Sequence, residues 1–187
     1  IEGHTVTADS TSRFRNGTLS GTFAIEGRHS IPSELVYEGT ITNRGILEAD
    51  PYGIAVDRLH IHGSIRNQGT VRNEPAPFSI YVDGSVTNEG TWETLDTRFI
   101  GSECNLAAVE KGLGGGWSAA DTVTIVAGSW LRFYGAHFDL NRGTLVMGNH
   151  PIELTEGSSL VDGNLGATEI YVNENSTLHG RVDGDVD

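Results

Sequence analysis

The chain has few of the groups that cross-link a protein or attract polyanions. Its single cysteine, Cys104, excludes a disulfide within the chain. Only 12 basic residues, of which Lys111 is the one lysine, stand against 25 acidic ones, and the net charge is −13. No basic surface is therefore expected to neutralise phosphates, and we expect no nucleic-acid partner.

Long apolar runs are also absent. No stretch approaches the roughly 20 apolar residues that cross a bilayer, so the sequence predicts no membrane span. The chain starts at Ile1 without a positively charged, apolar leader, and it has one methionine, Met147. Together with the scarcity of lysine, these features favour an extracellular or cell-surface location.

Glycine, in contrast, is abundant. It accounts for 25 of the 187 residues, whereas proline accounts for 5. This composition indicates frequent turns and argues against collagen and against a proline-rich disordered chain. A chain of this length is expected to build one core, so we expect a single domain.

The most informative feature is an internal repeat. Three thirteen-residue segments align without gaps and share the pattern apolar, any, apolar, any, Gly, Ser/Thr, Ile/Val, any, Asn, any, Gly: residues 35–47, 59–71 and 80–92. The glycines in the middle of the pattern, Gly39, Gly63 and Gly84, stand 24 and then 21 residues apart. One structural unit is therefore 21 to 24 residues long.

Alternation with a period of two inside each unit predicts half-buried strands. The core side is expected to contain Leu35, Tyr37, Ile41, Leu59, Ile61, Ile65, Ile80, Val82 and Val86. Each strand ends in Asn-x-Gly, where we expect the chain to turn a corner with the glycine at positive φ; these glycines are Gly45, Gly69 and Gly90. If the units stack, Asn43, Asn67 and Asn88 form a hydrogen-bonded ladder with a spacing of about 4.8 Å.

A second register follows. Residues 123–135, 152–163 and 170–180 share the pattern apolar, any, apolar, two residues, Gly/Asn, Ser, any, Leu. Residues 101–120 break the repeat and are expected to form an irregular insertion, with one or two helical turns over 105–113. The expected organisation is an irregular first coil or cap at 1–30, the first register at 31–100, the insertion, and the second register at 121–187.

Units this short cannot bury their apolar faces alone, whereas stacking produces a continuous core. The sequence therefore predicts an all-β protein, a single parallel β-helix (β-solenoid) over residues 1–187 with coils of about 18–29 residues. A hairpin sandwich is the alternative, because short strands with frequent turns also satisfy the pattern.

These repeat units resemble the coils of secreted bacterial β-helix proteins, such as autotransporter passenger domains and filamentous haemagglutinin-like adhesins. The resemblance covers residues 35–92 and 123–180. It implies a β-helix and the role of an adhesin, a surface-layer component or a filament subunit. The segment 179–186 (HGRVDGDV) also resembles bactofilin cytoskeletal β-helices, although the coil spacings differ from that family's.

Candidate catalytic groups are few. Asp83, Glu89 and Glu93 are expected near Arg66 and Arg72 of the preceding coil, an arrangement that a polysaccharide-degrading β-helix enzyme requires. Mixed charges are also the ordinary surface of a solenoid, so we expect no enzyme activity and name no catalytic residue.

Metal and cofactor motifs are incomplete as well. His60 and His62 lie on one face of a strand, but the sequence offers no recognisable third ligand. The Asp-x-Asp-x-Asp segment at 183–187 lacks the rest of a calcium loop. We therefore expect no cofactor and no resident metal, and we expect Cys104 to be a free thiol, with an intermolecular disulfide as the alternative.

Three functions remain open. The first is a structural extracellular protein that assembles head to tail with itself into a filament or surface layer, through ends that contain Ile1, Val6, Leu178, Val182 and Val186. The second is an adhesin or glycan-binding stalk that uses the outward aromatics Tyr81, Trp92 and Tyr171 and binds glycans or a host or cell surface. In that case these ends lie inside a longer stalk. The third is the polysaccharide-degrading enzyme.

Overall fold

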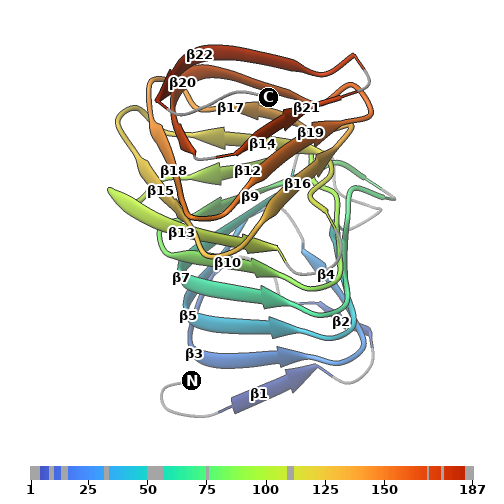
Figure 1. Ribbon diagram of the computed structural model, residues 1–187. Coiled ribbons are helices and arrows are strands. Elements are labelled where there is room, and N and C mark those ends of the chain that lie inside the picture. The colour runs from blue at the N-terminus through green and yellow to red at the C-terminus, as the bar shows by residue number, and fades with distance from the viewer. Residues whose placement is uncertain are drawn as a thin grey trace.

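The protein is a parallel β-solenoid of about seven turns, or coils. The computed structural model describes residues 5–8, 11–13, 17–31, 34–49, 57–74, 76–108, 112–167, 169–173 and 175–183. Figure 1 shows the coils stacked from β1 (Thr5–Ala8) at one end to β22 (Thr177–Asp183) at the other. Every strand pairing among these residues is parallel, and none of them forms a helix, which confirms the all-β parallel β-helix.

The strands are short, and the chain crosses three of them or two longer bent ones in each coil. In chain order they are β1, β2 (Thr11–Arg13), β3 (Gly17–Ile25), β4 (Arg28–Ile31), β5 (Glu34–Asn43), β6 (Ile46–Ala49), β7 (Asp57–Asn67), β8 (Thr70–Arg72), β9 (Phe78–Val82), β10 (Ser85–Asn88), β11 (Thr91–Trp92), β12 (Asp96–Phe99), β13 (Glu103–Ala108), β14 (Gly116–Ala119), β15 (Thr124–Ala127), β16 (Leu131–Tyr134), β17 (His137–Asp139), β18 (Thr144–Gly148), β19 (Ile152–Thr155), β20 (Ser159–Ala167), β21 (Ile170–Val172) and β22.

Parallel pairing arranges these strands into three sides. The first side contains β9, β12, β14 and β17, and the second contains β10, β13, β15 and β18. The long strands β5, β7, β20 and β22 bend and run along both of these sides. The third side consists of β2, β4, β6, β8 and β11 and, in later coils, of β16, β19 and β21.

The first repeat register is aligned as the sequence predicts. Leu59 pairs with Leu35 of the coil before it and with Ile80 of the coil after it. The nine apolar residues predicted for the core in this register are all buried. Alternation along each strand places one row of side chains inside the solenoid and the next row outside, so the period-two pattern determines which residues form the core.

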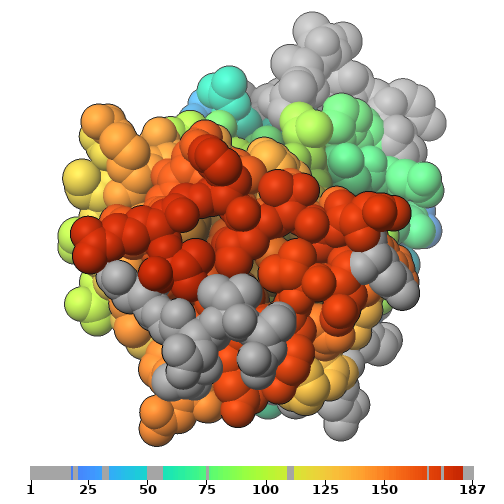
Figure 2. Space-filling view, turned by 45° about the horizontal axis from the view of Figure 1, so that its top comes forward, coloured from blue at the N-terminus to red at the C-terminus, as the bar shows by residue number. Residues whose placement is uncertain are grey.

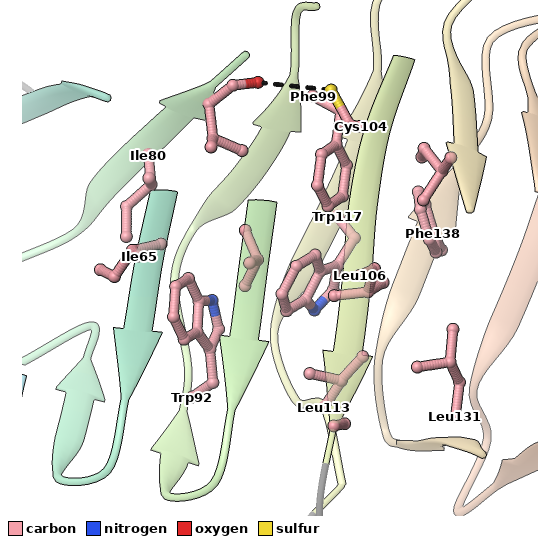
Figure 3. Packing of buried hydrophobic residues seen from close by; sticks show 14 of the residues in the cluster. Ile65, Ile80, Trp92, Phe99, Cys104, Leu106, Leu113, Trp117, Leu131 and Phe138 are labelled. Atoms are coloured by element: carbon pink, nitrogen blue, oxygen red, sulfur yellow. Dashed lines mark hydrogen bonds between the residues drawn. The ribbon is translucent and has the colours of Figure 1, made fainter. Parts of the chain in front are cut away.

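Aromatic rings fill the middle of the solenoid. Figure 3 shows Trp92, Phe99, Trp117 and Phe138, which come from successive coils and pack beside one another inside the stack. Their ring centroids are 5.6 Å apart for Trp92 and Trp117, and 6.1 Å apart for Phe99 and Trp117. Such offset contacts between buried rings add to the hydrophobic stabilisation of the stack.

The glycines of Asn-x-Gly have a different role from the one expected. Positive φ values occur at Gly39 and Gly63, in the bend between the first and second sides, and not at Gly45, Gly69 or Gly90. At these corners the coils approach so closely that a Cβ on Gly69 would lie 2.2 Å from the carbonyl oxygen of Gly45. Glycine is required there by contact with the preceding coil, not by its own backbone angle.

The expected irregular segments are largely regular. The helical turns predicted for 105–113 are wrong, because β13 covers residues 103–108 and pairs with β10 and β15. β14 then continues the first side between β12 and β17, so the break in the sequence repeat at 101–120 does not interrupt the strands of the first two sides. On the third side, β11 and β16 belong to separate sheets. The irregular first coil is likewise wrong for 17–31, since β3 pairs with β5 along its whole length.

The second register was misaligned by one side of the solenoid. Ile152 pairs with Ile170, as the pattern predicts, but its partner in the preceding coil is Leu131 rather than Val123. Residues 123–127 instead lie on the second side, where β15 pairs with β18. The pattern apolar, any, apolar occurs on all three sides, so it identifies a strand without identifying the side.

Candidate functional site

The asparagine ladder is present on the second side. The Nδ2 of Asn43 donates to Oδ1 of Asn67 at 2.7 Å, and the Nδ2 of Asn67 donates to Oδ1 of Asn88 at 2.8 Å. All three side chains are fully buried. Asn43 and Asn67 also donate to the carbonyl oxygens of Thr70 and Thr91, across the corner of the next coil. The ladder therefore ties each corner to its neighbours through buried hydrogen bonds.

The hydrogen bonding of the ladder ends differently at its two terminal residues, Asn43 and Asn88. Asn43 lies above Ile25, which has no polar side chain, and its Oδ1 is buried without a hydrogen-bond partner. At the other end, Asn88 donates to the carbonyl oxygens of Gly90 and Gly112.

In the second register a serine has a related role. The Oγ of Ser129 accepts a hydrogen bond from the N–H of Ala108 and donates one to the carbonyl oxygen of the same residue.

A second, exposed row of polar groups follows the same corner. The middle residue of each Asn-x-Gly contacts the next one: Arg44 donates to Gln68 at 3.2 Å, and Gln68 donates to Glu89 at 2.8 Å. Arg66 also donates to Glu89 at 2.8 Å. These hydrogen bonds from Gln68 and Arg66 hold the pKa of Glu89 below its ordinary value.

The charged groups that an enzyme would need are divided among different corners. Glu89 and Arg66 do meet, as the sequence suggests. Arg72, however, donates to Glu48 in the coil before it, and that carboxylate is buried. Asp83 accepts a hydrogen bond from the backbone N–H of Gly63, in the bend between the first and second sides. Asp83, Glu89 and Arg72 therefore lie at different places, and the predicted group does not assemble as one site.

The two histidines of β7 point outward and contact different partners. The ring of His60 stacks on Tyr81 of the next coil, with centroids 4.8 Å apart and planes 9° apart. Its Nε2 lies 3.3 Å from Oε1 of Glu34. His62 is 2.8 Å from Oδ2 of Asp83. Each imidazole is thus engaged in packing or pairing between coils.

These contacts yield a testable expectation about metal binding. Within the described residues, no group of three or more His, Cys, Asp or Glu side chains is arranged to hold a metal ion. We expect the purified protein and the variant His60→Ala/His62→Ala to contain the same substoichiometric zinc and copper by elemental analysis. One zinc or copper per chain in the native protein, lost in the double variant, would show that these histidines are ligands.

The first side carries a polar cluster that the sequence analysis did not identify. The Oγ of Ser118 donates to Oδ2 of Asp96 at 2.9 Å across neighbouring coils. Burial raises the pKa of Asp96, and the charge of Asp139, one coil beyond Ser118, raises it further. The hydrogen bond from Ser118, and then the charges of Arg98 and His137, oppose this rise in the pKa. Asp96 is therefore a weaker acid than an exposed aspartic acid, while its Oδ2 accepts the hydrogen bond of Ser118.

Cys104 is free and lies in the core. Its side chain is fully buried, and its Sγ lies 4.0 Å from the carbonyl oxygen of Val82, the contact drawn as a dashed line in Figure 3. Burial raises the pKa of the thiol, which disfavours the reactive thiolate. An intermolecular disulfide through this residue would require the core to open.

The aromatic residues predicted to point outward divide into three cases. Trp92 is buried, and its Nε1 donates to Oγ1 of Thr97 at 2.9 Å, so that prediction is wrong. Tyr81 is half-buried beneath His60. Tyr171 is exposed, and so are two aromatics that the sequence analysis did not select, Trp130 and Tyr134. All three exposed rings belong to the third side.

A shallow hollow lies at the bend between the first and second sides near the C-terminal end. Its volume is about 480 Å³, and it is lined by Asn141, Arg142, Asp162, Gly163, Asn164, His179 and Gly180. Three of the lining residues other than glycine, Asn141, Arg142 and Asp162, have positive φ values. Arg142 is also paired with Asp121 at 2.6 Å, so its guanidinium is held at the rim.

The residues expected at the ends of the assembly are only partly described. Ile1 and Val186 lie outside the described residues, and Val6 falls in β1. Leu178 and Val182 lie on β22 and are partly buried against the core. In the part of the chain that the structure describes, no helix is long and apolar enough to cross a membrane.

No protein-family model matches the chain, and searches of curated proteins and of solved structures return no significant match. The structure shows the β-solenoid architecture, whereas no match supports the autotransporter or haemagglutinin type in particular.

Proposed function

We propose that this protein is a structural β-solenoid that associates head to tail with further copies of itself, as a subunit of an extracellular filament or surface layer. The observation that carries the proposal is the last described coil. Val172, Leu178 and Val182, one on each side of the solenoid, are only partly buried there. The equivalent residues of the preceding coil, Leu154, Leu160 and Leu165, are buried.

The backbone of this coil supports the same proposal. β22 pairs with β20 along one edge and has no strand partner on its other edge among the described residues. Figure 2 looks onto this end and shows the last coil in red across it. An open edge with partly buried apolar groups offers backbone pairing and burial to a further coil.

A second copy of the chain is the partner that fits this edge. Neighbouring coils among the described residues pair in parallel, with register shifts between β18 and β20 and between β20 and β22, so a further coil can continue the stack by the same kind of backbone pairing. Such a contact is heterologous and propagates unless it closes a ring. The net charge of −13 opposes the approach of two copies, so salt should promote association.

We expect the purified chain to form linear oligomers at high protein and salt concentration, measured by multi-angle light scattering and negative-stain electron microscopy. The variant Leu178→Lys/Val182→Lys should remain monomeric, because it places two charges against the incoming coil. Thr177→Lys/His179→Lys adds two lysines to outward positions of the same strand and should still assemble. A native chain that stays monomeric under all of these conditions, or equal assembly of the two double variants, would overturn the proposal.

A further inference from the structure

The third side of the later coils exposes aromatic rings in an arrangement that packing inside this protein does not require. Four large apolar side chains are exposed among the described residues: Leu95, Trp130, Tyr134 and Tyr171. The three aromatic ones lie on or next to β16 and β21, the two strands that flank β19 in this sheet (Figure 1). Trp130, Tyr134 and Tyr171 are called the aromatic face below.

The strand geometry sets the spacing of these rings. Trp130, Arg132 and Tyr134 alternate with the buried Leu131 and Phe133, so they point outward together. Trp130 and Tyr134 are four residues apart, roughly 13 Å along an extended strand. Tyr171 is in register with Arg132 two strands away, about 10 Å across the sheet.

Charged groups separate and orient the rings. The guanidinium carbon of Arg132 lies 3.7 Å from the centroid of the Trp130 ring, and its Nε lies 3.2 Å from Oε2 of Glu153. The Tyr171 hydroxyl donates to Glu169 at 3.2 Å. Although Arg132 covers part of its ring, Trp130 remains 40% exposed. The aromatic face thus combines separated flat rings with hydrogen-bonding groups between them.

We propose that the aromatic face binds a neutral, extended glycan chain. Pyranose rings have an apolar C–H face that stacks on aromatic rings and a hydroxyl rim that bonds to groups such as Arg132, Glu153 and Glu169. A protein partner would instead favour a continuous apolar centre within a much larger contact area, and this face is interrupted by charges. The net charge of −13 disfavours polyanionic glycans.

The parallel pairing of the third side narrows the ligand class further. β16, β19 and β21 form a parallel ladder with neighbouring strands about 4.8 Å apart, so the outward rings stand on one surface of the sheet. A β-1,4-linked chain is itself an extended ribbon with its ring faces exposed, and it matches such a surface. Xylan-, cellulose-, mannan- and chitin-type oligosaccharides are the suitable probes.

Trp130 supplies a direct readout of binding. The other two tryptophans, Trp92 and Trp117, are each 1% exposed, so a ligand-dependent fluorescence change reports on Trp130. We expect at least one of xylohexaose, cellohexaose, mannohexaose and chitohexaose to shift the emission to shorter wavelength and to reduce acrylamide quenching. Polygalacturonate, the polyanionic control, should produce neither change.

Variants separate the aromatic face from exposed apolar surface in general. Trp130→Ala and Tyr171→Ala should each weaken binding about tenfold, measured by affinity electrophoresis and calorimetry on the native chain. Tyr171→Phe retains the ring and should bind within about twofold of the native protein, and Leu95→Ala, at an exposed apolar position outside the aromatic face, should not change affinity. The proposal is overturned if none of the four oligosaccharides binds, or if Trp130→Ala/Tyr171→Ala binds as well as Leu95→Ala does.

Discussion

Replacement of Asn67 by alanine is expected to lower the free energy of unfolding by about 3 kcal/mol. Asn67 is fully buried in the middle of the ladder, where it accepts a hydrogen bond from Asn43 and donates to Asn88 and to the carbonyl oxygen of Thr91. Alanine removes all three bonds and leaves a small cavity. Each buried hydrogen bond contributes about 1 kcal/mol, and the unpaired partners have no access to water. Chemical denaturation followed by far-UV circular dichroism measures the change.

The matched control is Asn105→Ala. Asn105 lies on β13, on the same side of the solenoid, but its side chain is exposed. The same substitution there should change the free energy of unfolding by less than about 1 kcal/mol. If the two variants unfold at the same denaturant concentration, the ladder contributes no stability and its hydrogen bonds only replace bonds to water.

The first half of the fold was predictable because one side chain pattern recurs in consecutive coils. Leu35, Leu59 and Ile80 occupy the same position of a gap-free repeat, and the structure pairs them directly. Since strands stack in register, alignment of the sequence with itself is equivalent to alignment of the coils in space. The asparagine positions follow from the same alignment, without knowledge of the handedness or the shape of the solenoid.

The second half of the fold was less predictable because its coils stack in the same way although their residues are not repeated from one coil to the next. Trp117 packs against both Phe99 and Phe138 in the core, yet the three segments share no motif. Trp92 was assigned outward although it occupies the buried position of Leu47 and Val71. Its indole N–H donates to Thr97 inside the core, so the one polar group of the side chain is satisfied without exposure to water.

The candidate sites on the surface depend on neighbours that are far apart in sequence. Asp96 and Ser118 are 22 residues apart and come together because β12 pairs with β14. Trp130 and Tyr171 are similarly joined through β19. Outward residues at these sites carry no repeating pattern, because many types of side chain are compatible with a position exposed to water. Only the register between coils places such residues side by side. The register of the later coils was the part that the sequence did not determine.

The largest expected effect belongs to Gly63→Ala. Gly63 lies in the bend of β7 with φ of +140°, and a Cβ there would be 2.1 Å from the carbonyl oxygen of Gly39 in the preceding coil. Gly39 and Gly63 are paired with each other in the ladder between β5 and β7, so neither backbone segment can move away without breaking hydrogen bonds of that ladder. We expect a loss on the order of 4 kcal/mol or more in the free energy of unfolding, or failure to fold cooperatively.

Gly157→Ala separates the contact from the backbone angle. Gly157 also has a positive φ, +76°, but a Cβ at that position meets no atom within 4 Å. Its cost should be limited to the strain of a left-handed residue, about 1 kcal/mol. A third variant, Gly128→Ala, has an ordinary φ and a Cβ contact of 3.4 Å with Ala107, and it should be nearly silent. The order Gly63, Gly157, Gly128 in denaturant midpoints, from lowest to highest, is the expected result. Equal midpoints for Gly63→Ala and Gly157→Ala would show that the coils can separate at the bend, so that close approach between glycines is not what holds them in register.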